Sequence, residues 1–164
     1  MIGKKIQDAF NKQINEELAS AYLYLSMEAY FHSEGLEGMA HWMRLQTQEE
    51  IAHAMKFFNF IHERGGTVKL QTISADLHKN WKSPLEIFQA SYQHEQHITA
   101  CINDLVKLSK EEEDYPASVF LQWFVTEQVE EEANTSQVVQ MLERVGDSGN
   151  GIYMVDQALG RRGA

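Results

Sequence analysis

A glutamate and a histidine three residues apart are the first residues in this 164-residue chain whose spacing could support chemistry. Glu50 and His53 lie in the run Glu49-Glu50-Ile51-Ala52-His53, and an offset of three residues points both side chains to one side of a helix. The apolar Met43 and Phe57 share that side, which predicts that it faces a core. A buried carboxylate is costly unless a cation pairs with it, so the pattern predicts a metal site.

Further polar residues interrupt apolar stripes near the middle of three other helical segments. They are Glu17, Glu95 and the pair Gln128 and Glu131, which repeats the three-residue offset of Glu50 and His53. For any single glutamate, a carboxylate at the edge of the stripe that reaches water is the simpler interpretation. For His53 alone, a hydrogen-bonded core histidine is the simpler one. Interruptions at one height in four helices favour a shared site instead.

The charges of these residues indicate which ion the site would take. Glu17, Glu50, Glu95 and Glu131 would bring four negative charges, which two divalent cations would neutralise. Without metal the carboxylates would repel one another, and some would stay protonated. Oxygen-rich coordination with one imidazole suits iron or manganese better than zinc. We therefore predict a di-iron site.

Four long helices must position these ligands. Apolar periodicity predicts helices over about residues 6–32 and 36–64, a third from the capping sequence Ser83-Pro84-Leu85-Glu86, and a fourth opened by Pro116. Each would be about 40 Å long at about 1.5 Å per residue. Residues 67–82 lack helical periodicity, and so long a connection in a bundle predicts a crossover that makes the second and third helices parallel.

The predicted fold is all-α: a four-helix bundle with a long crossover between helices two and three and a short fifth C-terminal helix. The glycine-rich segment 146–151 ends the fourth helix, and Ile152, Val155 and Leu159 mark the fifth. A helix this short is unstable alone, so it must pack on something. We expect one domain over residues 1–164, with the bundle in 1–146 and the linker and short helix in 147–164.

The composition limits which partners and which cellular compartment are expected for the protein. Lys and Arg total 14 against 24 Asp and Glu, a net charge of −10, which disfavours nucleic acid and anionic membranes as partners. No apolar run approaches the roughly 20 residues that cross a bilayer, and the N-terminus lacks a signal-peptide pattern. The single cysteine, Cys101, fits a reducing, cytoplasmic compartment, and its apolar neighbours predict a buried, inert thiol. The acidic run 111–114 is expected to be a solvated helix end.

The chain resembles non-haem bacterial-type ferritin from end to end. The resemblance rests on Ala40-His41-Trp42, Gln48-Glu49-Glu50-Ile51-Ala52-His53-Ala54, Phe120-Leu121-Gln122-Trp123-Phe124 and Glu127-Gln128-Val129-Glu130-Glu131-Glu132. It implies a ferroxidase that oxidises Fe(II) with dioxygen or hydrogen peroxide. It also implies storage of the Fe(III) as mineral in a hollow homo-oligomeric shell of twenty-four subunits.

The resemblance also implies roles for single residues. The first iron would be held by Glu17, Glu50 and His53, and the second by a bridging Glu50 with Glu95 and Glu131, close to Gln128. Tyr24, a core aromatic on its spacing alone, would hydrogen-bond near the site and donate an electron. A third, weaker iron site facing the cavity would use Glu49, Glu127 and Glu130, which the sequence alone indicates to be solvated charges.

Departures from related families narrow the expectation. Bacterioferritins have a second Glu-x-x-His and a haem-ligating Met where this chain has Gln128-x-x-Glu131 and Ile51, so no haem is expected. The acids that line the animal-type entry channel are replaced by Pro116-Ala117-Ser118-Val119. The sequence therefore does not predict where iron enters. Two alternatives remain: a non-storage di-iron oxidase or peroxide reductase, and a structural helical-bundle interaction protein. The fifth helix disfavours the first alternative.

Overall fold

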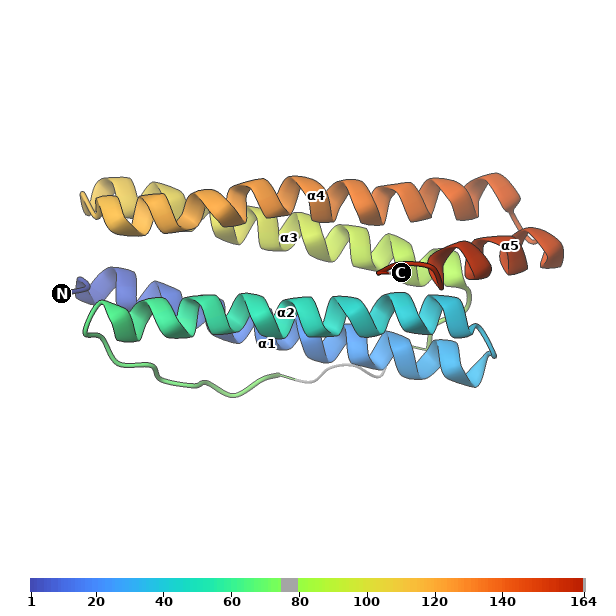
Figure 1. Ribbon diagram of the computed structural model, residues 1–164, viewed down its shortest axis with the longest axis horizontal. Helices are drawn as coiled ribbons and strands as arrows, with labels where there is room; N and C mark the ends of the chain where they lie inside the picture. The colour runs from blue at the N-terminus through green and yellow to red at the C-terminus, as the bar shows by residue number, and fades with distance from the viewer. Residues whose placement is uncertain (75–79, 164) are drawn as a thin grey trace.

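Four long helices lie side by side, and a short fifth helix packs against two of them at one end (Figure 1). The structure is a computed structural model that describes residues 1–74 and 80–163. The helices of these residues are α1 (Lys4–Ser33), α2 (Glu37–Glu63), α3 (Pro84–Glu111), α4 (Tyr115–Val145) and α5 (Gly149–Leu159), and no strand occurs among them. The predicted all-α bundle with a short fifth helix is confirmed.

The directions of the helices match the predicted long crossover between α2 and α3. α1 and α2 are antiparallel, as are α3 and α4, whereas α2 and α3 run in the same direction (Figure 1). The start of the crossover is tied to α1, because the backbone N–H of Lys69 donates to Asn11 Oδ1 at 2.7 Å and the Asn11 side chain donates to the carbonyl of Thr67 at 3.1 Å. Within the predicted crossover, residues 75–79 lie outside the described residues.

Side-chain caps fix where α3 and α4 begin. Ser83 caps α3 as predicted, with its Oγ accepting from the backbone N–H of Glu86 at 3.2 Å. α4 begins at Tyr115, one residue before Pro116, and is capped by Asp114, whose Oδ1 accepts from the N–H of Ala117 at 3.1 Å. Because Asp114 also pairs with Arg64 at 2.9 Å, this residue of the acidic run has a structural role that the prediction of a solvated helix end did not include.

Two apolar clusters occupy the two halves of the bundle and leave a polar layer between them. Phe10, Phe57 and Phe124 belong to one cluster, and the rings of Phe57 and Phe124 lie 4.3 Å apart. Phe31 and Phe88 belong to the other. The buried polar side chains of the middle turns include Glu17, Gln46, Glu50, His53, Glu95, Gln128 and Glu131. The aromatic clusters therefore stabilise the bundle while the middle turns present polar side chains inward.

The fifth helix docks on the start of α2 through a close backbone approach. A Cβ added at Gly38 would lie 1.8 Å from the carbonyl oxygen of Asp156, so only glycine allows this contact. The carboxylate of Asp156 accepts from the backbone N–H of Met39 at 2.8 Å, which satisfies a free donor at the α2 N-terminus. Packing of the fifth helix is confirmed, but α5 begins at Gly149, inside the segment predicted to be a linker.

Across residues 1–74 and 80–163, none of the helices combines the length and apolarity that crossing a membrane requires.

Candidate metal centre

Three of the predicted ligands meet in the polar layer between α1 and α2. One donor atom from each of Glu17, Glu50 and His53 lies within 4.8 Å of the others, and all three side chains are buried. The Nδ1 of His53 is 3.4 Å from Oε2 of Glu50. The helix offset of three residues therefore does place the imidazole and the carboxylate together. Their role as iron ligands stays a prediction.

Two carboxylate oxygens of this group are buried without a hydrogen bond. Oε1 of Glu17 accepts from Gln13 Nε2 at 2.9 Å, but Oε2 of Glu17 and Oε2 of Glu50 find no hydrogen-bond partner among the described residues. Leaving such an acceptor unpaired costs about 1–3 kcal/mol, and more if it is charged. A cation between the two carboxylates would pair with both oxygens, so the site fits a metal ion.

When no metal is bound, the electrostatics of the polar layer favour the protonated forms of its buried carboxylates. Burial raises the pKa of Glu17 and of Glu50 well above the usual range, and the charges of neighbouring carboxylates raise them further. Burial also raises the pKa of Glu95, and it raises the pKa of Glu131 to about 7. Metal binding would therefore displace protons from these carboxylates.

Glu95 is held by two neighbours from other helices. The Tyr24 hydroxyl donates to Oε1 of Glu95, and Gln128 Nε2 donates to Oε2 of Glu95 at 3.2 Å. Burial raises the pKa of Tyr24 well above its usual value, so the phenol remains a hydrogen-bond donor. These contacts place Tyr24 and Gln128 directly beside a predicted ligand.

Glu131 is oriented by a glutamine on α2. Gln46 Nε2 donates to Oε2 of Glu131 at 2.9 Å, and donor atoms of Glu131, Glu127 and His53 lie within 4.8 Å of one another. Within residues 1–74 and 80–163, the predicted second set of Glu50, Glu95 and Glu131 is not gathered within that distance. Glu95 is instead hydrogen-bonded to Tyr24 and Gln128, and Glu131 to Gln46.

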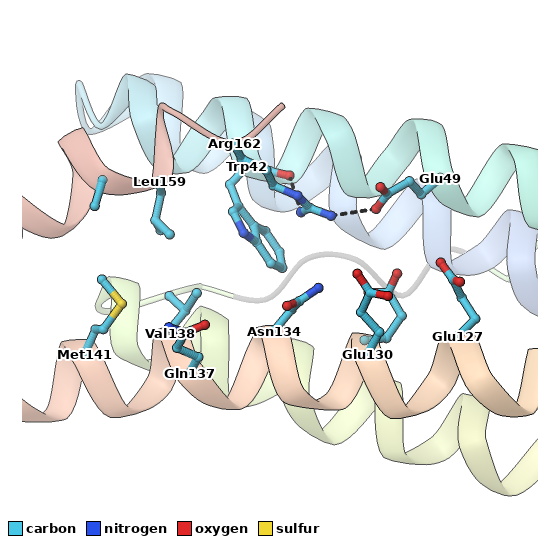
Figure 2. A pocket seen from close by; sticks show the side chains of 12 residues that line it. Trp42, Glu49, Glu127, Glu130, Asn134, Gln137, Val138, Met141, Leu159 and Arg162 are labelled. Carbon is cyan, nitrogen blue, oxygen red and sulfur yellow. Dashed lines mark hydrogen bonds and ion pairs between the residues drawn. The ribbon is translucent and has the colours of Figure 1, made fainter. Parts of the chain in front are cut away.

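The three glutamates expected to form a weaker third site line a groove between α2 and α4. Figure 2 shows Glu49, Glu127 and Glu130 in this cavity of about 490 Å³, which the end of the chain also lines. Arg162 reaches Glu49 with Nη2 at 2.6 Å from Oε2, and its guanidinium lies 4.5 Å from the centre of the Trp42 ring. An arginine therefore already neutralises one of the three glutamates.

The residues that support the ligands were not predicted from the sequence. Gln46 and Gln13 each lie four residues before a predicted ligand, and Gln46 interrupts an apolar stripe as the glutamates do, so its spacing could have identified it. Trp123 packs edge-on against His53, with ring centres 5.4 Å apart. No local signal marks Arg162, which lies 113 residues from Glu49 in the chain.

Comparisons with known proteins find relatives that match nearly the whole chain. The family model described as "Ferritin-like domain" matches residues 7–145. The chain is 43% identical over 162 residues to a bacterial non-heme ferritin of Bacteroides fragilis, covering 99% of this chain and 100% of that one. It is 38% identical to that of Campylobacter jejuni, covering 96% and 93%. A solved structure of an open pore ferritin from the archaeon Archaeoglobus fulgidus matches with a TM-score of 0.96 and 46% identity, covering 99% of both chains.

Proposed function

Because the chain belongs to the ferritin family of iron-storage proteins, we propose that its buried polar layer is an intrasubunit di-iron ferroxidase site. The observation that carries this proposal is that one buried carboxylate oxygen of Glu17 and one of Glu50 lack a hydrogen bond beside His53. These donors would hold one Fe(II). Glu50 would bridge to a second Fe(II) held with Glu95 and Glu131.

The reaction balances with iron as substrate and an oxidant from solution. Each of two Fe(II) ions loses one electron, and dioxygen takes up both electrons with two protons and leaves as hydrogen peroxide. With peroxide as the oxidant, the same two electrons and two protons give two water molecules. Hard, anionic oxygen ligands favour Fe(III) over Fe(II), so the glutamates make the bound iron easier for the oxidant to oxidise.

The protein residues prepare the site and then release the product. Fe(II) would displace the protons that burial holds on Glu17 and Glu50, while Tyr24 and Gln128 keep the Glu95 carboxylate oriented. Tyr24 is also the residue we expect to supply an electron: when only one Fe(II) is bound, its phenol would give one electron and one proton in place of the second Fe(II), so dioxygen would still leave as hydrogen peroxide. From the layer, Glu127 leads outward, because its carboxylate lies 3.8 Å from His53 Nε2 and also lines the acidic groove. Glu49, Glu127 and Glu130 would form the third iron site and lead Fe(III) towards the mineral.

We expect the subunits to close a homo-oligomeric shell of twenty-four copies in the cytoplasm. Large apolar side chains exposed on the single chain support subunit contacts, since such side chains are often covered in an assembly. They include Tyr115, Val119, Val129, Tyr153 and Met154. Size-exclusion chromatography with light scattering tests this: a particle near twenty-four subunits supports the shell, and a monomer or dimer contradicts it.

Aerobic Fe(II) oxidation by single variants tests the ferroxidase site. Glu50→Ala and His53→Ala each remove a ligand, so the initial rate should fall at least roughly tenfold. The exposed neighbours on α2 supply matched controls, and Glu63→Ala and His62→Ala should oxidise iron at the wild-type rate. Unchanged initial rates in both ligand variants would refute the site.

A further inference from the structure

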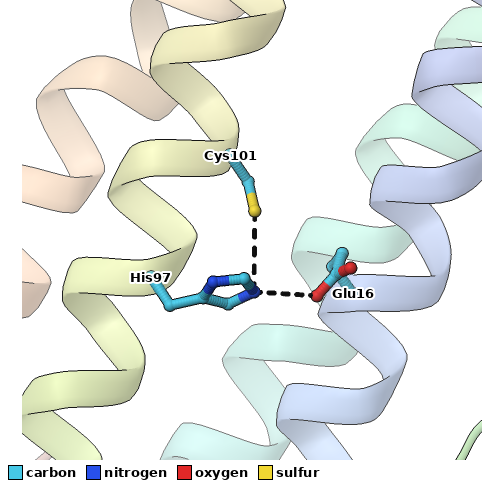
Figure 3. Close-up of side chains that lie close together, drawn as sticks. All are labelled: Glu16, His97 and Cys101. Atoms are coloured by element: carbon cyan, nitrogen blue, oxygen red, sulfur yellow. Dashed lines mark hydrogen bonds and ion pairs between the residues drawn. The ribbon is translucent and has the colours of Figure 1, made fainter.

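A second group of potential ligands lies in the groove between α1 and α3, outside the metal centre. Glu16 directly precedes Glu17, but a helix turns about 100° between neighbours, so its carboxylate leaves the core. His97 and Cys101 are one turn apart on α3 and project towards it. Figure 3 shows the imidazole of His97 between the thiol and the carboxylate.

The distances within this group are those of ligands around one ion. His97 Nε2 lies 3.1 Å from Oε2 of Glu16 and 3.6 Å from Sγ of Cys101, and the three donors all lie within 4.8 Å of one another. Zinc bonds of about 2.3 Å to sulfur and about 2.0 Å to nitrogen or oxygen, at tetrahedral angles, separate donor atoms by about 3.3–3.6 Å. The side chains therefore need little movement to surround a single ion.

One imidazole nitrogen faces two potential partners at once. Nε2 of His97 offers either one N–H or one lone pair, so it cannot bond fully to both Glu16 and Cys101. An ion between the three donors would bond to all of them. We propose that Glu16, His97 and Cys101 bind a divalent metal ion of the zinc class, a function separate from iron oxidation.

The surroundings of the group leave the fourth coordination position to solvent. The side chain of His97 is 55% exposed and that of Glu16 is 26% exposed. An adjoining cavity of about 220 Å³ is lined by Glu16 and Cys101 together with Lys12, Gln13 and Asp104. The positive charge of Lys12 would repel a cation there, and the negative charge of Asp104 would attract one. Asp104 also pairs with Lys107 at 3.0 Å. A bound water would complete four-coordination.

The neighbouring histidine is already engaged elsewhere. His94 lies one turn before His97, with ring centres 6.1 Å apart, and its Nε2 is 2.7 Å from the hydroxyl of Ser20. The ligand set is therefore one thiolate, one imidazole and one carboxylate. It is softer than the oxygen-rich metal centre, so the two sites should select different metals.

Metal binding at this group involves no electron transfer. The S–H bond of Cys101 breaks, a metal–sulfur bond forms, and the proton passes to solvent. His97 binds through the lone pair of Nε2 and retains its proton on Nδ1. Glu16 contributes an anionic oxygen, so the ion's two positive charges are balanced by the thiolate and the carboxylate.

Cobalt(II) titration of the metal-free, assembled protein tests the proposal directly. Cys101 is the only cysteine in the chain, so a thiolate-to-cobalt absorption band can come from no other residue. We expect the band to saturate at one cobalt per subunit and to disappear when zinc(II) is added. The titration should be repeated in the Glu50→Ala/His53→Ala double variant, where retention of the band separates this site from the ferroxidase site.

Variants distinguish a site made of three ligands from metal binding by the thiol of Cys101 alone. Cys101→Ser should abolish the band, and His97→Ala and Glu16→Gln should each weaken cobalt binding by roughly tenfold or more. His62→Ala, which removes an exposed histidine on α2, should bind as the wild type does. The proposal is overturned if no band forms, or if His97→Ala and Glu16→Gln both retain wild-type affinity.

Discussion

Arg162 and Glu49 form an ion pair with Nη2 2.6 Å from Oε2, and this pair joins the end of the chain to the acidic groove. The arginine lies where a metal ion would compete for the same carboxylate. The guanidinium also packs on the Trp42 ring and donates from Nη1 to the Trp42 carbonyl at 3.4 Å, so its position is fixed by three contacts. In the proposed third site, Arg162 therefore acts as an internal competitor for iron.

Replacing Arg162 should strengthen metal binding at the third site. Arg162→Ala removes a positive charge beside Glu49. Because the pair is partly exposed, its contribution is about 0.5–1 kcal/mol, which corresponds to a gain in affinity of roughly two- to fivefold. Anaerobic calorimetry with Fe(II) would resolve this weaker binding step. The neighbouring Arg161→Ala is the control, and an affinity in Arg162→Ala equal to that of the wild type would contradict the competition.

The metal-free protein should lose stability as the pH rises. The pKa of Glu131 rises from 4.5 to about 7 on folding, so the folded state holds its proton more tightly than the unfolded state does. Its stabilising contribution is complete below about pH 4.5 and is lost as the pH passes about 7. The raised pKa values of Glu17 and Glu50 act in the same direction.

Denaturant unfolding of the metal-free protein between pH 5 and pH 8 measures this loss. The rise of the Glu131 pKa to about 7 corresponds to roughly 3 kcal/mol, so Glu131→Gln should reduce the pH dependence of the unfolding free energy by up to that amount. The exposed Glu63→Gln should leave it unchanged. A divalent metal should restore stability most strongly at pH 8. A free energy of unfolding that does not fall with pH would show that the buried carboxylates remain paired without metal.

The sequence predicted the parts of the site that depend on helical periodicity. Glu50 and His53 meet because their offset is a property of the helix itself, and Glu17 joins them because an acid on an apolar stripe must face the same interior. The parallel direction of α2 and α3 followed from the length of their connection. Each of these inferences needed only local spacing or length.

Contacts between distant segments could not be predicted in this way. The pairing of Arg162 with Glu49 and the docking of Asp156 on Met39 depend on how α5 turns back on α2. The apolar neighbours of Cys101 predicted a buried thiol, but the structure leaves it partly exposed. That prediction was wrong because Cys101 lies at the edge of the α3 stripe, where the groove against α1 remains open.

Removing the hydroxyl of Tyr24 should slow iron oxidation without preventing iron binding. Tyr24→Phe deletes the hydrogen bond to Glu95 and the proposed electron donor but removes no predicted ligand. We expect a several-fold lower initial rate of Fe(II) oxidation with the anaerobic Fe(II) stoichiometry unchanged. Stopped-flow absorption measures the rate, and Tyr22→Phe on the exposed side of α1 is the control. Equal rates in the wild type and Tyr24→Phe would remove Tyr24 from the mechanism.

A methyl group at Gly38 should detach α5 while leaving the metal centre intact. The new Cβ would lie 1.8 Å from the carbonyl oxygen of Asp156 and 2.6 Å from its carbonyl carbon, and these backbone atoms can move only if the whole helix shifts. The displaced helix would also lose the Asp156 contact to the N–H of Met39. Overpacking of this kind costs about 1–3 kcal/mol.

Limited proteolysis of the C-terminal segment and thermal unfolding measure this detachment. Gly38→Ala should be cleaved within α5 faster than the wild type and should unfold at a lower temperature. Gly149→Ala is the matched control, because a Cβ there meets nothing within 4 Å. Gly38 lies twelve residues before Glu50, which is about 18 Å along the helix, so the initial oxidation rate should be unchanged. Resistance to cleavage equal to that of the wild type would show that α5 is held by its apolar contacts alone.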